Sequence, residues 1–258
     1  MKLFLSTYYM LLFYILYQMS WKFINFISPL EPQYIFFAKA LAFFNLPVEI
    51  HSVLYLITLF FCLLCVFSQD RILRVLTACF VLILFSINFS YGQIHHSHHP
   101  WILSSVLCCF FDSKQSLNLK QNFFVLRLVQ GILLSHYFIS GLWKLRSMWS
   151  AGFSFSLTEI ATEAIAYEFA FKHNKNFILE LLLYEIPWFL GFSYFCVLLF
   201  QLTALSPILF NRYFKLYGTL AVLFHLSTGI SLNVYFSPNV LAVLFFLILG
   251  ESMKEKLK

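Results

Sequence analysis

The sequence predicts an all-α protein, a polytopic integral membrane bundle of about eight transmembrane helices. Of its 258 residues, 61% are hydrophobic and only 11% are charged, more apolar side chain than a water-soluble core can enclose. Apolar runs of about 20 residues, the length that crosses a bilayer, recur along the chain. Basic residues are divided unevenly between the connecting segments, as in membrane proteins of defined topology. We expect residues 1–258 to form a single transmembrane domain with no separate soluble domain.

Six apolar runs are long enough to be assigned as membrane crossings. They cover residues 3–21, 51–68, 75–92, 123–143, 187–210 and 217–236. The first is interpreted as a transmembrane helix and not as a signal peptide, because no small-residue cleavage site follows it. Trp101–Phe111 and Val240–Gly250 are short for a crossing at about 1.5 Å per residue. Glu180 and Glu185 are placed near the outer end of a long helix.

Two further segments are expected to lie at the membrane interface. Residues 22–50 contain Pro29, Pro32 and Pro47 around a short amphipathic stretch. Residues 153–171 carry glutamates at spacings of four and five, at Glu159, Glu163 and Glu168. These glutamates form either a solvated helix face or the lining of an entrance.

The basic residues decide whether the two short runs cross. If both cross, ten basic residues share one side: Lys2, Arg71, Arg74, Lys114, Lys120, Arg212, Lys215, Lys254, Lys256 and Lys258. Six lie on the other: Lys22, Lys39, Lys144, Arg146, Lys172 and Lys175. The side with more positive charge is normally cytoplasmic. We therefore expect a multi-pass protein of the bacterial inner membrane with both termini in the cytoplasm and with Lys144 facing outward.

The stretch Gln130–Gly152 places polar groups on one face of an apolar helix. Spacings of three and four put five residues on that face: Gln130, Leu134, Tyr137, Gly141 and Lys144. Gly141 has no side chain, so another helix or a ligand can approach the backbone one turn before Lys144. A lysine in this apolar, aromatic setting loses hydration, which disfavours its charged form and makes a neutral amine available as a base. The alternative is a lysine that reaches to the membrane surface as an anchor.

Histidines and cysteines do not predict a metal centre. His95, His96, His98 and His99 are clustered, but a di-iron site needs more ligands, and the remaining histidines are isolated in the sequence. His225 lies in the middle of an apolar run, where a packing role and a catalytic role are both open. The six cysteines lie in apolar segments and are interpreted as packed thiols, including the Cys62–Cys65 pair. The net charge of +6 is spread over loops and does not indicate a nucleic-acid partner.

The run Tyr137–Gly152 resembles the YFxxGxxKLxxxWxxG signature of HTTM proteins, the transmembrane domain of vitamin K-dependent γ-carboxylases. Two weaker similarities follow the family's order. His98-His99-Pro100-Trp101-Ile102 is similar to its Asn-His-x-Tyr-Leu segment, and Phe224-His225-Leu226 to its later Phe-His-Leu helix. Gln201 stands where many members carry an acidic residue.

The resemblance implies an enzyme, a carboxylase-like lyase with a reduced vitamin K-type quinone as cofactor and no metal. Lys144 would deprotonate the hydroquinone, and oxygenation of the quinol would yield a strong base that removes a glutamate γ-proton before CO2 adds. His99 would assist near the quinone and His225 would support the pocket. The residues expected to border the quinone are Tyr137, Gly141, Trp143, His98 and Trp101. Trp143 and Trp149 are expected to exclude water from the amine.

The resemblance also leaves a second class of function open. Small HTTM proteins include a maturation factor for a secreted sporulation-delay peptide toxin. The chain is therefore either an enzyme that modifies a peptide or small substrate at the outer face, or a non-enzymatic membrane module that assists maturation or export of a peptide.

Overall fold

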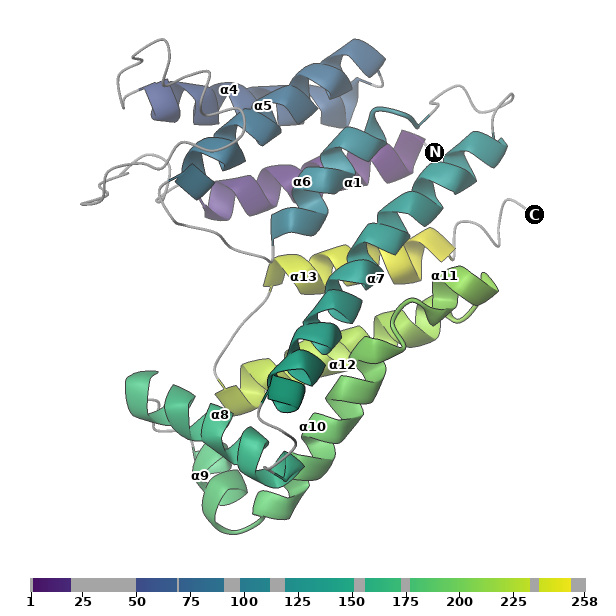
Figure 1. Cartoon of the computed structure of the whole chain (residues 1–258). Coiled ribbons are helices and arrows are strands. Elements are labelled where there is room, and N and C mark those ends of the chain that lie inside the picture. Colours follow the sequence, from purple (N-terminus) through teal and green to yellow (C-terminus); the bar gives the residue numbers. More distant parts are fainter. Residues whose placement is uncertain are drawn as a thin grey trace. The chain divides into compact units, whose positions relative to one another are not determined.

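The computed structural model describes residues 2–19, 50–68, 70–90, 98–111, 119–150, 156–172, 177–232 and 237–251 (Figure 1). Within these ranges the regular structure is entirely helical, which confirms the all-α class. Two of the described helices are long and apolar enough to cross a membrane, Ile50–Phe67 and Lys120–Ser150. Pro187–Leu202 and Pro238–Leu249 are apolar but shorter. The eight-crossing topology stays a prediction, and segment 22–50 lies outside the described residues except for Ile50.

The chain divides into two compact units, Met1–Val129 and Gln130–Lys258, so helix α7 (Leu119–Ser150) contributes to both. The first unit is built from α1 (Lys2–Gln18), α4 (Ile50–Phe67), α5 (Arg71–Ser90) and α6 (His99–Cys108). In chain order, each of these helices packs against the next. The predicted runs 3–21, 51–68 and 75–92 thus correspond to α1, α4 and α5.

Tyr8 joins α1 to α6 in the core of the first unit. Its ring stacks on Trp101 with centroids 5.7 Å apart, and its hydroxyl donates a hydrogen bond to the Trp101 carbonyl at 3.1 Å. Both side chains are fully buried. A stacked aromatic pair with a satisfied hydroxyl combines large apolar burial with a paired polar group. This contact fixes the short helix that carries His99.

Arg74 is buried in the first unit, with only 2% of its surface exposed. Its Nη1 donates to the carbonyl of Cys108, the last residue of α6, at 2.9 Å. A cation there meets the negative end of the helix dipole. Arg74, one of the basic residues used to predict the topology, therefore also connects α5 to α6.

The cysteines within the described helices are free thiols. Cys62, Cys65, Cys108 and Cys109 are buried, as predicted for packed thiols. Cys79 and Cys196 are instead exposed, on α5 and on α10 (Pro187–Leu202), because their helix positions face away from the packed neighbours.

The second unit contains the C-terminal part of α7 and six further α-helices among its described residues, ending in a π-helix. Its elements are α8 (Leu157–Lys172), α9 (Phe177–Tyr184), α10 (Pro187–Leu202), α11 (Ser206–Phe210), α12 (Phe214–Leu232), α13 (Ser237–Ala242) and η2 (Val243–Leu249). Helix α10 packs along α8, and α12 packs along η2. Gln130 donates its side-chain N–H to the Phe246 carbonyl of the π-helix at 2.9 Å, which attaches this segment to α7.

Two predicted helices are broken in the second unit. Glu180 and Glu185 do not share a long helix, because α9 ends at Tyr184 and α10 begins at Pro187. The run 187–210 is likewise split into α10 and α11, and Pro207 lies in the first turn of α11. A proline lacks the N–H that an interior helix position donates and restricts the residue before it, so each break falls next to one.

The segment predicted at 153–171 contains α8, which starts at Leu157. Ser156 and Glu159 form a reciprocal cap: the Ser156 N–H donates to the Glu159 carboxylate at 2.5 Å, and the Glu159 N–H donates to the Ser156 hydroxyl oxygen at 3.2 Å. Hydrogen bonding to the Glu159 carboxylate, first from the Ser156 backbone N–H and then from the Ser156 side chain, lowers the pKa of Glu159. Glu159 and Glu163 are exposed, which agrees with the solvated-face interpretation.

Candidate functional site

A small polar cluster surrounds the Lys144 amine in the second unit. The Lys144 Nζ donates to the Gln201 Oε1 at 2.8 Å and to the Ser140 hydroxyl at 3.4 Å. The Gln201 amide nitrogen lies 3.5 Å from the same Ser140 oxygen, so the three side chains form a closed set. Gln201 is buried, with 2% exposed, and Lys144 is half-buried.

Gly141 allows this cluster to form. A Cβ placed at residue 141 would lie 2.9 Å from the Gln201 Cβ and 3.1 Å from the Leu202 backbone nitrogen. Neither distance leaves room for a side chain, so α10 packs directly on the α7 backbone at Gly141. Ser140 and Lys144, on either side of the crossing, are therefore within reach of Gln201. The predicted close approach one turn before Lys144 is present, and the approaching element is a helix.

The hydrogen-bond partners of Lys144 among the described residues are neutral. An amide oxygen and a hydroxyl can accept a bond from an ammonium, but neither supplies the negative charge that would hold a proton on the amine. A lysine that merely anchors a helix at a lipid surface directs its charge towards water or phosphate. Lys144 instead directs its amine towards α10.

A second pair lies on the same face of α7. The Tyr137 hydroxyl and the His225 Nε2 are 2.7 Å apart, and both side chains are buried, with 3% and 5% exposed. Aromatic rings surround the pair: Phe200 packs on Tyr137 at a centroid distance of 5.5 Å, and Phe224 packs on His225 at 5.1 Å. His225 is thus hydrogen-bonded and packed, and its catalytic role stays a prediction.

Helix α10 links the lysine cluster to the tyrosine–histidine pair through two consecutive residues. Phe200 contacts Tyr137, and Gln201 binds Lys144. Tyr137 and Lys144 are seven residues apart, which is about two helical turns along one face. The arrangement offers an amine able to accept a proton and, along the same face, a phenol–imidazole pair that can pass or orient one.

The tryptophans near Lys144 lie on the surface. Trp143 is 59% exposed and Trp149 is 73% exposed. The Arg146 guanidinium lies 4.9 Å from the centroid of the Trp143 ring, a cation–π contact on that outer face. The Lys144 amine donates to Gln201 of α10, and the exclusion of water by Trp143 and Trp149 stays a prediction.

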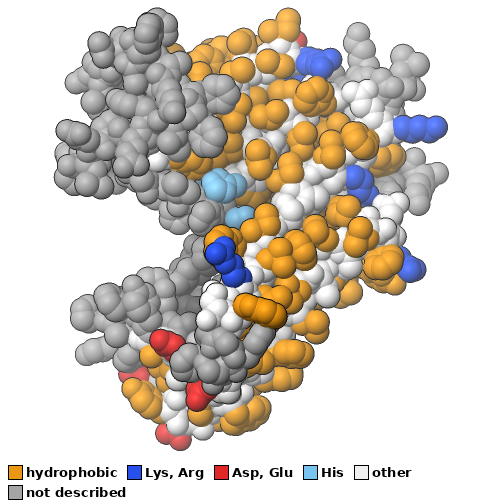
Figure 2. Space-filling view, viewed as in Figure 1, with side chains coloured by type: hydrophobic (Ala, Val, Ile, Leu, Met, Phe, Trp, Pro, Cys, Tyr) orange, Lys and Arg blue, Asp and Glu red, His pale blue; other side chains and the backbone are white. Residues whose placement is uncertain are grey.

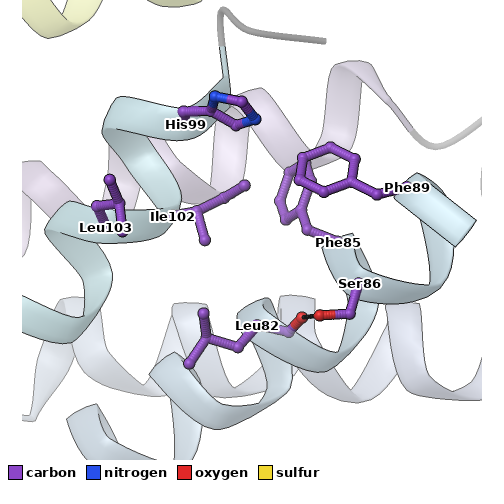
Figure 3. Close-up of a pocket in the computed structure, with 7 residues that line it drawn as sticks. All are labelled: Leu82, Phe85, Ser86, Phe89, His99, Ile102 and Leu103. Atoms are coloured by element: carbon purple, nitrogen blue, oxygen red, sulfur yellow. Dashed lines mark hydrogen bonds between the residues drawn. The ribbon is translucent and has the colours of Figure 1, made fainter. Parts of the chain in front are cut away.

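The remaining predicted site residues belong to the first unit. His98 and Trp101 are buried, and His99 is partly exposed. The His98 ring packs on Phe85 at 5.6 Å, and the His99 ring meets the edge of Phe89 at 5.4 Å. His99 also borders an apolar pocket between α5 and α6 (Figure 3). The approach of His99 to Lys144 stays a prediction, whereas Lys144, Tyr137, Gly141 and His225 belong to one unit.

Sequence reasoning missed Ser140 and Phe200 as parts of the site. Ser140 precedes Lys144 by four residues, a spacing that places both on one helix face and could have found it. Nothing local to Phe200 indicates its contact with Tyr137. Gln201 was singled out only through the family resemblance.

In comparisons with known proteins, no family model, curated protein or solved structure matches this chain. Among the described residues, no group of three or more His, Cys, Asp or Glu side chains could hold a metal ion.

Proposed function

We propose that the chain is a helical membrane enzyme in which the Lys144 amine acts as a base towards a lipid-soluble quinol. The observation that carries the proposal is the neutral set of partners around Lys144, with Gln201 at 2.8 Å and Ser140 at 3.4 Å. A half-buried amine whose partners, among the described residues, are neutral releases its proton more readily than one paired with a carboxylate. A neutral amine can then take a proton from a phenolic hydroxyl.

Membrane placement is the other part of the proposal. The two long apolar helices support it, as do the large apolar side chains exposed over much of the described surface (Figure 2). A substrate that dissolves in the bilayer could reach Lys144 without leaving the lipid. The quinol class and the carboxylase-like reaction follow from the Tyr137–Gly152 resemblance to HTTM proteins. Tyr137 and His225 would orient the substrate hydroxyl or relay its proton.

The test measures oxygen uptake with reduced vitamin K-type quinones by protein in lipid nanodiscs. Lys144→Arg keeps a cation but supplies no base, because a guanidinium stays protonated at working pH. Lys144→Ala removes the group. We expect both variants to lose about 100-fold or more of the quinol-dependent rate, the lower range for removal of a general base. Lys120→Ala, which removes an exposed lysine from the same helix, should keep the rate.

Equal rates in the wild type and in both Lys144 variants would remove the base role. Undiminished maturation of a secreted peptide by those variants would then favour the non-enzymatic membrane module.

A further inference from the structure

A pocket of about 300 Å³ lies between α5 and α6, wholly within the first unit (Figure 3). Leu82, Ile102 and Leu103 form its aliphatic walls, and the rings of Phe85 and Phe89 form its aromatic wall. The volume is at the lower end of the range for small-molecule sites. Taking roughly 30 Å³ for each non-hydrogen atom, as for a water molecule, it holds a chain of about ten atoms.

The polar groups of the lining are few. Ser86 donates its hydroxyl to the Leu82 carbonyl at 2.6 Å, so that proton is already used within α5. His99 lies at one end of the pocket, where its ring meets the edge of Phe89. An occupant is therefore contacted by carbon along most of its length. This lining suits a hydrocarbon chain better than a ring with several oxygens, which would lose hydrogen bonds on entry.

The pocket also reaches the molecular surface. Leu103, one of its walls, is 45% exposed. Large apolar side chains are exposed elsewhere on α5 and just after α6, including Val75, Leu76 and Phe110. In a bilayer, such a surface is surrounded by lipid acyl chains. Their concentration there is higher than that of any dissolved apolar molecule.

From these three observations we propose that the α5–α6 pocket binds one acyl chain of a bilayer lipid. The inference rests on the membrane placement in the proposed function but not on the chemistry of Lys144. The chain lies between the Phe85 and Phe89 rings and the Leu82, Ile102 and Leu103 side chains, and its free end points to His99 or to the surface beside Leu103. A lipid held in this way acts as a structural part of the first unit.

Trp101 provides the test, because it is fully buried and directly precedes Ile102 in the pocket wall. One protein keeps Trp101 alone, with the other four tryptophans changed to phenylalanine. A second keeps Trp101 and Trp143. Both are placed in vesicles of phosphatidylcholine brominated at one of several positions along the acyl chain, since bromine quenches indole fluorescence at short range. The exposed Trp143 reports contact with lipid at the protein surface.

We expect brominated chains to quench Trp101, with a maximum at one bromine position. Ser86→Leu fills the pocket, Leu103→Phe narrows its opening, and either change should reduce the quenching to a small residual. Cys79→Leu, an apolar substitution at an exposed site on the same helix, should leave it unchanged.

Quenching of Trp143 without quenching of Trp101 would overturn the pocket inference and leave the membrane placement standing. Quenching of Trp101 that persists equally in Ser86→Leu and Leu103→Phe would also overturn it, because the chains would then lie outside the pocket. If neither tryptophan is quenched, the membrane placement fails and the inference fails with it.

Discussion

Lys144 differs from an ordinary interfacial lysine in its hydrogen-bond partners. Its amine donates to the side-chain amide of Gln201 and to the hydroxyl of Ser140, and both groups are neutral. Gln201 lies on α10 and is buried, with 2% of its surface exposed. We therefore expect the identity of residue 201 to affect how firmly the amine keeps its proton. A carboxylate at this position would stabilise the ammonium by direct charge pairing.

Gln201→Glu should consequently shift the activity towards higher pH. The paired amine becomes free of its proton only as the pH rises, so the quinol-dependent rate should fall at neutral pH and recover in alkaline buffer. The measurement is the pH–rate profile of oxygen uptake in nanodiscs. Gln121→Glu, which adds the same charge at an exposed position of α7, should leave the profile in place. A profile unchanged by Gln201→Glu would contradict control of Lys144 by residue 201.

At the scale of helices, the second unit depends on glycines whose missing side chain lets a neighbouring helix approach closely. Gly141 admits α10 beside α7, and Gly218 admits η2 beside α12, where an added Cβ would lie 2.9 Å from the Ile248 Cγ1. Gly131, on the same helix as Gly141, faces open space apart from the Ile208 Cδ1 at 3.9 Å. Two glycines of one helix thus have different consequences for packing.

Gly141→Ala should destabilise the second unit by about 1–3 kcal/mol, the usual range for an overpacked contact, and should weaken the bond between Lys144 and Gln201. Gly131→Ala should be neutral or stabilising by up to about 1 kcal/mol, because alanine is the better helix former. Unfolding of the purified protein in detergent, followed by circular dichroism, measures both. Equal stability of the two variants would show that the α7–α10 crossing tolerates a side chain.

At the scale of the whole molecule, the distribution of basic residues predicts the side of the membrane on which each segment lies. The ten-to-six division of these residues was derived from the sequence alone, for eight crossings. The structure adds that Arg74, one of the ten, is buried against the end of α6. The other nine are sufficient to preserve the bias.

A topology reporter tests the eight-crossing arrangement directly. Fused after Lys258, it should be active only in the cytoplasm, and inserted near Asn174 it should be active only outside, because an even number of crossings brings the C-terminus back to the side of the N-terminus. The same reporter placed after Lys120 should be cytoplasmic and serves as a reference within the chain. Activity on the opposite side at either test position would rule out the arrangement.

The sequence by itself determined the helical class, the approximate position of most helices and the shared face of Tyr137, Gly141 and Lys144. Those features depend on local composition and on the helical period of 3.6 residues. Both can be recognised within a short, continuous stretch of sequence. Only the tertiary structure decided that Gln201 binds Lys144, that Tyr137 bonds to His225 and that Arg74 is buried. Each of these contacts joins helices whose relative rotation and offset are set by side-chain packing between distant segments, and no local pattern encodes that packing.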